Sequence, residues 1–155
     1  MKHINGITFA AATDNDLETL VAIRIEAMRE SLQRIGRYDP IRARERFSNS
    51  FSPEHTQFVI VSDERVGFLV VKPHTDYLLL DHLYIKPHWQ NQGIGAATLK
   101  HVFSEADRIK LPVRVGALRD SDSNRFYLRH GFRLVESTEF DNYYMRPFAA
   151  NETSS

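Results

Sequence analysis

The sequence predicts an α/β (α+β) fold, with a mixed, mostly antiparallel central sheet of about seven strands and helices on both faces. Apolar residues recur at helical spacing from about residue 15, and β-branched runs of period two follow from residue 57. A strand, a helix and a second strand then fill residues 77–118, and such a crossover makes its two strands parallel. The expected order is β-α-α-β-β-β-α-β-α-β-β.

The first part of the chain is expected to form one strand and two helices. Thr13 is suited to cap the first helix, because acidic residues follow it at the positive helix end. Gly36 ends that helix, and Asp39-Pro40 begins the second, with proline in its first turn. The expected elements are a strand over Ile7–Ala12 and helices over 15–34 and 41–51.

The remainder of the chain begins with two turns, at residues 62–65 and 72–76, which connect three antiparallel strands. Further along, Gly131 closes a short helix. The expected elements are strands over 58–61, 66–71 and 77–85, a helix over 93–109, a strand over 113–118, a helix over 121–130, and strands over 132–139 and 142–148. We expect one domain over residues 1–150 and a disordered tail over 151–155.

Composition excludes several classes of function. The 155 residues include no cysteine, so thiol nucleophiles, zinc–thiolate sites and redox pairs are excluded. The 20 Lys+Arg balance the 20 Asp+Glu, which gives no electrostatic case for a nucleic-acid partner. No stretch approaches the roughly 18 apolar residues of a membrane span, so we expect no membrane partner and a cytoplasmic location. The seven histidines have no metal-site spacing, and no metal is expected.

A loop with two glycines connects the strand that ends at Ile85 to the helix that begins near Gly93. At a helix start, backbone N–H groups lack acceptors and the helix dipole is positive, so this point favours a phosphate group. Gly93 and Gly95 have no side chain to block a close approach, and the small Ala96 and Ala97 allow tight packing. The sequence therefore predicts an anion site; a helix start that merely tolerates glycine is the alternative.

Two common phosphate loops do not fit this segment. A P-loop requires Gly-Lys-Ser/Thr at the helix start, whereas Gly95 is followed by alanine. A dinucleotide-binding loop requires a third small residue where Thr98 stands, and an acidic residue near the end of a second strand, where residues 113–118 contain none. The pattern that remains is Gln90-x-x-Gly93-x-Gly95.

This pattern resembles the diphosphate loop of the GNAT superfamily of acyl-CoA-dependent N-acyltransferases, [Arg/Gln]-x-x-Gly-x-[Gly/Ala]. The resemblance extends to Leu83-Tyr84-Ile85-x-Pro87 upstream and to Phe126-Tyr127-x-x-x-Gly131-Phe132 downstream, and the order of elements agrees over about residues 7–148. Asp120 stands where the family often has Asn, and Ser123 where it often has Ala. The resemblance implies acetyl-CoA as the donor, and the two departures indicate altered polar contacts to its pantetheine arm.

The resemblance also implies a role for each matching segment. The loop would hold the diphosphate, and the strand end would align the pantetheine arm and stabilise the oxyanion formed when a bound amine attacks the thioester directly. Tyr127 matches the family tyrosine near the sulfur and is the expected general acid; a core aromatic residue is the alternative. The expected cofactor-binding residues are Leu83, Tyr84, Ile85, Gln90, Asn91, Gln92, Gly93, Ile94, Gly95, Ala96, Asp120 and Ser123.

The general base has two candidates on the strand before the loop. Period-two alternation puts Asp81 on the same face as Leu83, at a place where some family members carry a catalytic Glu or His. An imidazole is the better base near neutral pH, but His82 lies on the other face unless a bulge intervenes. Asp81 is therefore the expected base.

The acceptor is expected to be a primary amine whose identity the sequence leaves open. In this fold, acceptor choice rests on the elbow near residues 30–40 and on the hairpin at 140–144, and neither carries a recognisable motif. The exposed last strands of such sheets can pair between chains, so a homodimer is one expectation. The alternative function is a catalytically silent CoA-binding sensor or interaction module, because Asp120 and Ser123 depart from the family pattern.

Overall fold

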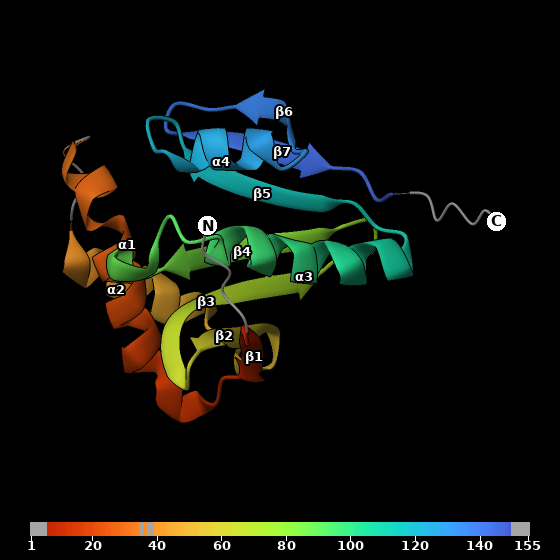
Figure 1. The fold of residues 1–155 in the computed structure, drawn as a ribbon. Helices are drawn as coiled ribbons and strands as arrows, with labels where there is room; N and C mark the ends of the chain where they lie inside the picture. Colours follow the sequence, from red (N-terminus) through yellow and green to blue (C-terminus); the bar gives the residue numbers. More distant parts are fainter. Residues whose placement is uncertain (1–5, 35, 37–38, 150–155) are drawn as a thin grey trace. The chain divides into compact units, whose positions relative to one another are not determined.

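A computed structural model of the protein describes residues 6–34, 36 and 39–149. Seven strands form one sheet in the order β1-β2-β3-β4-β5-β7-β6 (Figure 1). The α+β class and the predicted order of elements are confirmed. The strands are β1 Thr8–Ala11, β2 Thr56–Val61, β3 Glu64–Pro73, β4 Leu78–Ile85, β5 Val113–Leu118, β6 Arg133–Ser137 and β7 Asp141–Arg146; the helices are α1 Leu17–Arg34, α2 Pro40–Ser50, α3 Ile94–Ile109 and α4 Ser123–Arg129.

The chain divides into two compact units. The first consists of the residues up to Val70 together with His82–Ala97, and the second consists of Val71–Asp81 together with the residues from Thr98 onward. The predicted tail at 151–155 and the last residue of the predicted domain, 150, lie outside the described residues. Among the described residues, no helix is long and apolar enough to cross a membrane.

The first unit builds its core between the strands and the two N-terminal helices. Strand β2 pairs antiparallel with both β1 and β3, and α1 and α2 lie side by side (Figure 1). On β3 the register shifts, because Val59 pairs with Gly67 whereas Ile60 pairs with Arg65, which leaves one extra residue in β3. The buried core residues of this cluster are Ala12, Leu20, Val21, Ile23, Phe47, Phe58, Phe68 and Val70.

The helix starts of the first unit follow the predicted capping residues. Thr13 and Asp16 form a capping box around a short 3₁₀ turn, Asp14–Asp16, which leads directly into α1. Asp39 caps α2, since its carboxylate accepts a hydrogen bond of 3.1 Å from the Arg42 N–H. Arg37 and Tyr38, in the elbow that was expected to help select the acceptor, lie outside the described residues.

In the second unit, β5 pairs with the first half of β4 and with β7. The β4–β5 pairing is parallel, with Leu78 opposite Val113, and this confirms the predicted crossover. Strand β7 runs antiparallel to β5 and to β6, which is one of the two edge strands of the sheet. Helix α4 is shorter than the predicted 121–130, because the Ser121 N–H bonds back to the Leu118 carbonyl in a turn that delays the helix start.

Candidate functional site

The glycine loop occupies one continuous stretch of the first unit. After β4 ends at Ile85, a 3₁₀ turn over Pro87–Trp89 leads to Gln90, and α3 begins at Ile94. Asn91 and Gly93 both have left-handed backbones, with φ of +63° and +82°. The two left-handed residues turn the chain from the strand into the helix within four positions, and glycine and asparagine tolerate this conformation best.

Two side chains brace this loop from within. The Gln90 amide donates to the Ile85 carbonyl at 2.8 Å, and the Gln92 amide donates to the His88 carbonyl at 3.3 Å. Both glutamines therefore satisfy acceptors of the loop itself. Their role in the structure is to hold the loop backbone in place, which sequence patterns alone did not reveal.

The surface beside this loop has room for an anionic group. A Cβ built on Gly93 would have no atom within 4 Å, so the space next to this residue is open. The first turn of α3 contains no acidic residue that would repel an anion. The positive end of a 16-residue helix therefore lies next to an unobstructed glycine, and these features fit a diphosphate.

The end of β4 lies unusually close to β3. An ideal Cβ on Gly67 would lie 2.2 Å from the Tyr84 carbonyl oxygen and 3.1 Å from the Ile85 Cα. The Lys86 N–H donates to the Val66 carbonyl at 2.8 Å, which fixes the strand end at the same point. Only glycine permits this approach, so Gly67 supports the segment predicted to bind the cofactor, and sequence analysis missed it.

Period-two alternation correctly places His82 and Tyr84 on one face of β4. The His82 ring lies 5.2 Å from the Phe47 ring, and the Tyr84 ring lies 5.5 Å from the Phe68 ring. The Tyr84 hydroxyl and His82 Nδ1 are 3.2 Å apart, within hydrogen-bonding distance. The Arg24 guanidinium lies 5.8 Å from the centre of the Tyr84 ring. His82 is thus held by aromatic neighbours on the side of the strand that packs on α2.

Asp81, the predicted base, belongs to the second unit. Its carboxylate forms an ion pair of 3.3 Å with the Lys72 ammonium, and both side chains are partly buried. This contact gives Asp81 a visible structural partner. Its role as a base stays a prediction.

Tyr127, the predicted acid, is buried in the second unit with 5% of its surface exposed. Its ring lies 5.2 Å from the Phe132 ring and 6.3 Å from the Tyr144 ring. Its backbone carbonyl accepts from the N–H groups of His130 and Phe132, which closes α4. The packing holds the ring in one place, as both a core residue and a positioned acid require.

The two residues that depart from the family pattern, Asp120 and Ser123, are both exposed in the second unit. The polar side chain that makes the most contacts in this segment is instead Asn124, which sequence analysis did not single out. Among the described residues, no group of three or more His, Asp or Glu side chains is arranged to hold a metal ion.

Comparison with known proteins shows which family has a domain similar to this chain. A profile described as an acetyltransferase (GNAT) domain matches residues 53–134, more than half of the chain. No curated protein matches the chain in sequence.

Among solved structures, the PaiA N-acetyltransferase from Thermoplasma acidophilum, crystallised with coenzyme A, is 18% identical, with a TM-score of 0.76 over 92% of this chain and 99% of that one. An acetyltransferase from Thermus thermophilus is also 18% identical, with a TM-score of 0.74 over 94% and 99%. The ribosomal-protein-S18-alanine N-acetyltransferase from Escherichia coli is 17% identical, with a TM-score of 0.67 over 97% and 100%.

Proposed function

Because the chain belongs to the GNAT acetyltransferase family, we propose that it transfers an acetyl group from acetyl-CoA to a primary amine by direct attack of the bound amine. The observation that carries the proposal is the braced loop at the start of α3, whose open glycine and unopposed helix end fit a diphosphate. The absence of cysteine agrees with direct attack, because no thiol is present to form an acyl-enzyme.

The loop residues Gln90–Ala96 are proposed to bind the diphosphate mainly through backbone N–H groups. The side chains of Gln90 and Gln92 already donate to loop carbonyls, so their contribution is to keep the loop rigid. A loop held in its binding geometry loses little conformational entropy when the ligand arrives, and this favours affinity.

The backbone of Leu83–Ile85 is proposed to align the pantetheine arm and to stabilise the developing oxyanion. The bound thioester supplies an activated acyl group, and N–H donors aimed at its carbonyl oxygen stabilise the negative charge of the tetrahedral intermediate. The close approach at Gly67 supports this role, because it leaves the strand end little freedom to move.

Two proton transfers complete the proposed reaction. Asp81 is the proposed base for the attacking ammonium group, directly or through a water molecule, and His82 is the alternative. Tyr127 is proposed to protonate the departing thiolate, and Asp120 and Ser123 are proposed to lie near the pantetheine arm. Packing against Phe132 fixes the Tyr127 ring, which the role of an acid requires, and the Tyr127→Phe variant below distinguishes that role from a purely structural one.

The proposal is tested by thiol release from acetyl-CoA in the presence of small amines, amino acids and peptides with a free N-terminus. An aromatic disulfide reagent can report the thiol without background, because the protein contains no cysteine. Release that depends on an acceptor supports the enzyme. Tight binding of acetyl-CoA in calorimetry without release for any acceptor would support the CoA-binding sensor instead.

Two variants test the proton-transfer roles. Tyr127→Phe should lower kcat strongly and leave acetyl-CoA affinity nearly unchanged, because only the acidic hydroxyl is removed. Asp81→Asn should remove the lower limb of the pH–rate profile, whereas His82→Gln serves as the comparison. If Asp81→Asn leaves the profile unaltered and His82→Gln removes the limb, the base is His82.

A further inference from the structure

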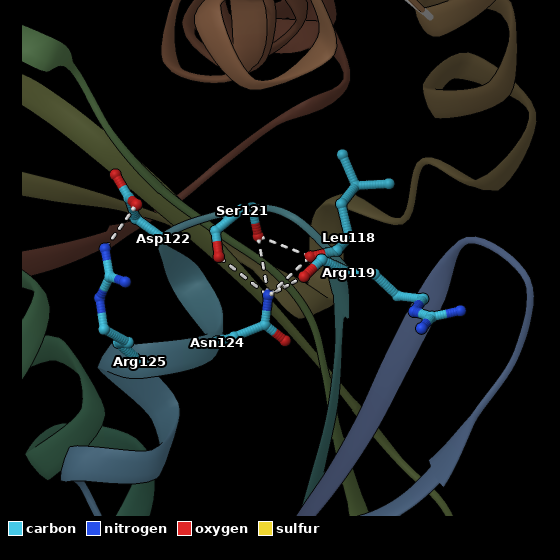
Figure 2. A network of polar contacts seen from close by, with 6 residues as sticks. All are labelled: Leu118, Arg119, Ser121, Asp122, Asn124 and Arg125. Carbon is cyan, nitrogen blue, oxygen red and sulfur yellow. Dashed lines mark hydrogen bonds and ion pairs between the residues drawn. The ribbon is translucent and has the colours of Figure 1, made fainter. Parts of the chain in front are cut away.

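Asn124 lies in the first turn of α4, and its side chain contacts the end of β5 and the turn that connects β5 to α4. Its side-chain nitrogen lies 2.7 Å from the Leu118 carbonyl oxygen, 3.1 Å from that of Arg119 and 2.9 Å from that of Ser121 (Figure 2). One amide group therefore donates hydrogen bonds to the backbone carbonyls at the end of β5 and in the turn that follows. These are the residues that connect the strand to the helix.

The other end of the same amide binds β7. Its oxygen accepts from the Asn142 amide at 2.9 Å and from the Tyr144 hydroxyl at 2.7 Å. The reverse orientation would place the oxygen against three carbonyl oxygens, so the contacts allow only one orientation. Both donor hydrogens and both acceptor lone pairs are engaged, and the amide is saturated.

Asn124 does not cap the helix, because its amide donates to carbonyls and accepts from side chains rather than from helix N–H groups. Asp122, the N-cap residue, makes no capping hydrogen bond with its side chain. Its carboxylate instead forms an ion pair of 3.1 Å with the exposed Arg125 (Figure 2). Within the second unit, the hydrogen bonds of Asn124 connect the start of α4 to the end of β5 and to β7.

A short path connects Asn124 to Tyr127. The two residues are three apart in α4 and therefore share a face of the helix. Tyr144, which is 3% exposed, donates its hydroxyl to Asn124 and places its ring 6.3 Å from the Tyr127 ring. Displacing Asn124 would release the helix turn that carries Tyr127 and the ring that packs on it.

We propose that Asn124, acting with Tyr144, is a positioning residue for Tyr127 in the acetyl transfer. This inference rests on the proposed function, in which Tyr127 protonates the thiolate. Asn124 touches no reacting atom in this role. It fixes the place of the phenol, and a displacement of about 1 Å at a reacting group can cost on the order of 100-fold in rate.

The test is a double-mutant cycle measured as thiol release from acetyl-CoA with the best acceptor of the amine panel. Asn124→Ala should lower kcat by about tenfold, and Tyr144→Phe by about threefold, with the KM for acetyl-CoA little changed. In a Tyr127→Phe background, both substitutions should have almost no further effect, because the group that they position is gone. A pH–rate series should show the alkaline limb moved in Asn124→Ala and lost in Tyr127→Phe.

Ser137→Ala is the matched control. It removes the 2.6 Å hydrogen bond from the Ser137 hydroxyl in β6 to the Asn142 side-chain oxygen in β7, but it removes no partner of Asn124, so kcat should stay unchanged. Equal losses of kcat with and without the Tyr127 hydroxyl would overturn the inference. If Asn124→Ala fails to fold, Tyr144→Phe decides by the same comparison. If Tyr127→Phe itself keeps full activity, Tyr127 is not the acid. That result overturns the proposed role of Tyr127, whereas equal effects of Asn124→Ala in both backgrounds overturn only the positioning role of Asn124.

Discussion

Gly67→Ala should damage both stability and acetyl-CoA use, because the new methyl group would meet backbone. The Cβ would lie 2.2 Å from the Tyr84 carbonyl oxygen, whereas real Cβ atoms essentially never approach another heavy atom within 3.0 Å. The two strands must therefore separate locally by about 0.8 Å. The second contact, 2.8 Å to the Ile85 Cδ1, adds to the crowding.

The expected cost can be worked out from this overlap. Forcing extra atoms into a packed site costs about 1–3 kcal/mol, and a clash with backbone belongs at the upper end. For a chain of 155 residues, about 3 kcal/mol corresponds to a fall in Tm of roughly 6–12 °C. The moved segment is the one proposed to bind the thioester, so kcat/KM for acetyl-CoA should fall by about 100-fold at temperatures where the variant is folded.

Calorimetry and the thiol-release assay measure the two effects separately. Gly116→Ala in β5 is the matched control, because its Cβ would meet the Tyr143 side chain at 3.0 Å, which requires a shift of only a few tenths of an ångström, and would lie 3.9 Å from the nearest backbone atom. This variant should lose little Tm and keep its kcat/KM. A Gly67→Ala protein with an unchanged Tm and normal kcat/KM would refute the reasoning, since it would mean that the strand end absorbs the methyl group without cost.

Gly93→Ala should lower stability by about 1–2 kcal/mol and weaken acetyl-CoA binding, because alanine is strained at a φ of +82° even in open space. Gly36→Ala, at +70° and equally open, should show similar strain but unchanged acetyl-CoA affinity in calorimetry. The Arg146 guanidinium lowers the pKa of Asp107, so this pair stabilises the fold above about pH 4 and loses that contribution as the pH falls through the lowered pKa. Asp107→Asn should therefore cost about 1–2 kcal/mol at pH 7 and flatten the acid limb of Tm against pH, whereas Glu105→Gln, in an exposed pair with Arg108, should change Tm little.

The elements that the sequence predicted well are those whose signals are local. Thr13 and Asp39 lie next to the helices that they cap, and apolar spacing marks the faces of α1 and α3. The parallel pairing of β4 with β5 followed from the length of the connection between them. In each case, the physical cause lies within one turn or one crossover of the residue that reveals it.

Gly67 shows why other features could not be predicted. Nothing in its neighbourhood along the chain requires glycine, because its backbone is extended and Val66 and Phe68 are ordinary strand residues. The requirement comes from the Tyr84 carbonyl on another strand, which lies 17 residues further along the chain. A pattern of neighbouring residues in the sequence does not show which atoms of another strand will lie against Gly67.

Asn124 illustrates the same limit at the candidate site. Residues 120–125 are all polar, so polarity does not mark which of them faces the sheet. Asn124 and Tyr127 share one face of the helix whether it begins at 121 or at Ser123, but the partners of Asn124 in the turn after β5 and in β7 come together only in the folded chain. Comparison with the family motif draws attention to Asp120 and Ser123, which are both exposed. The side chain that connects β5, α4 and β7 is Asn124, at a position for which the motif specifies no residue. Substitutions near Tyr127 should therefore be judged by which hydrogen bonds they remove, and Asn124 should matter more to kcat than either position that departs from the motif.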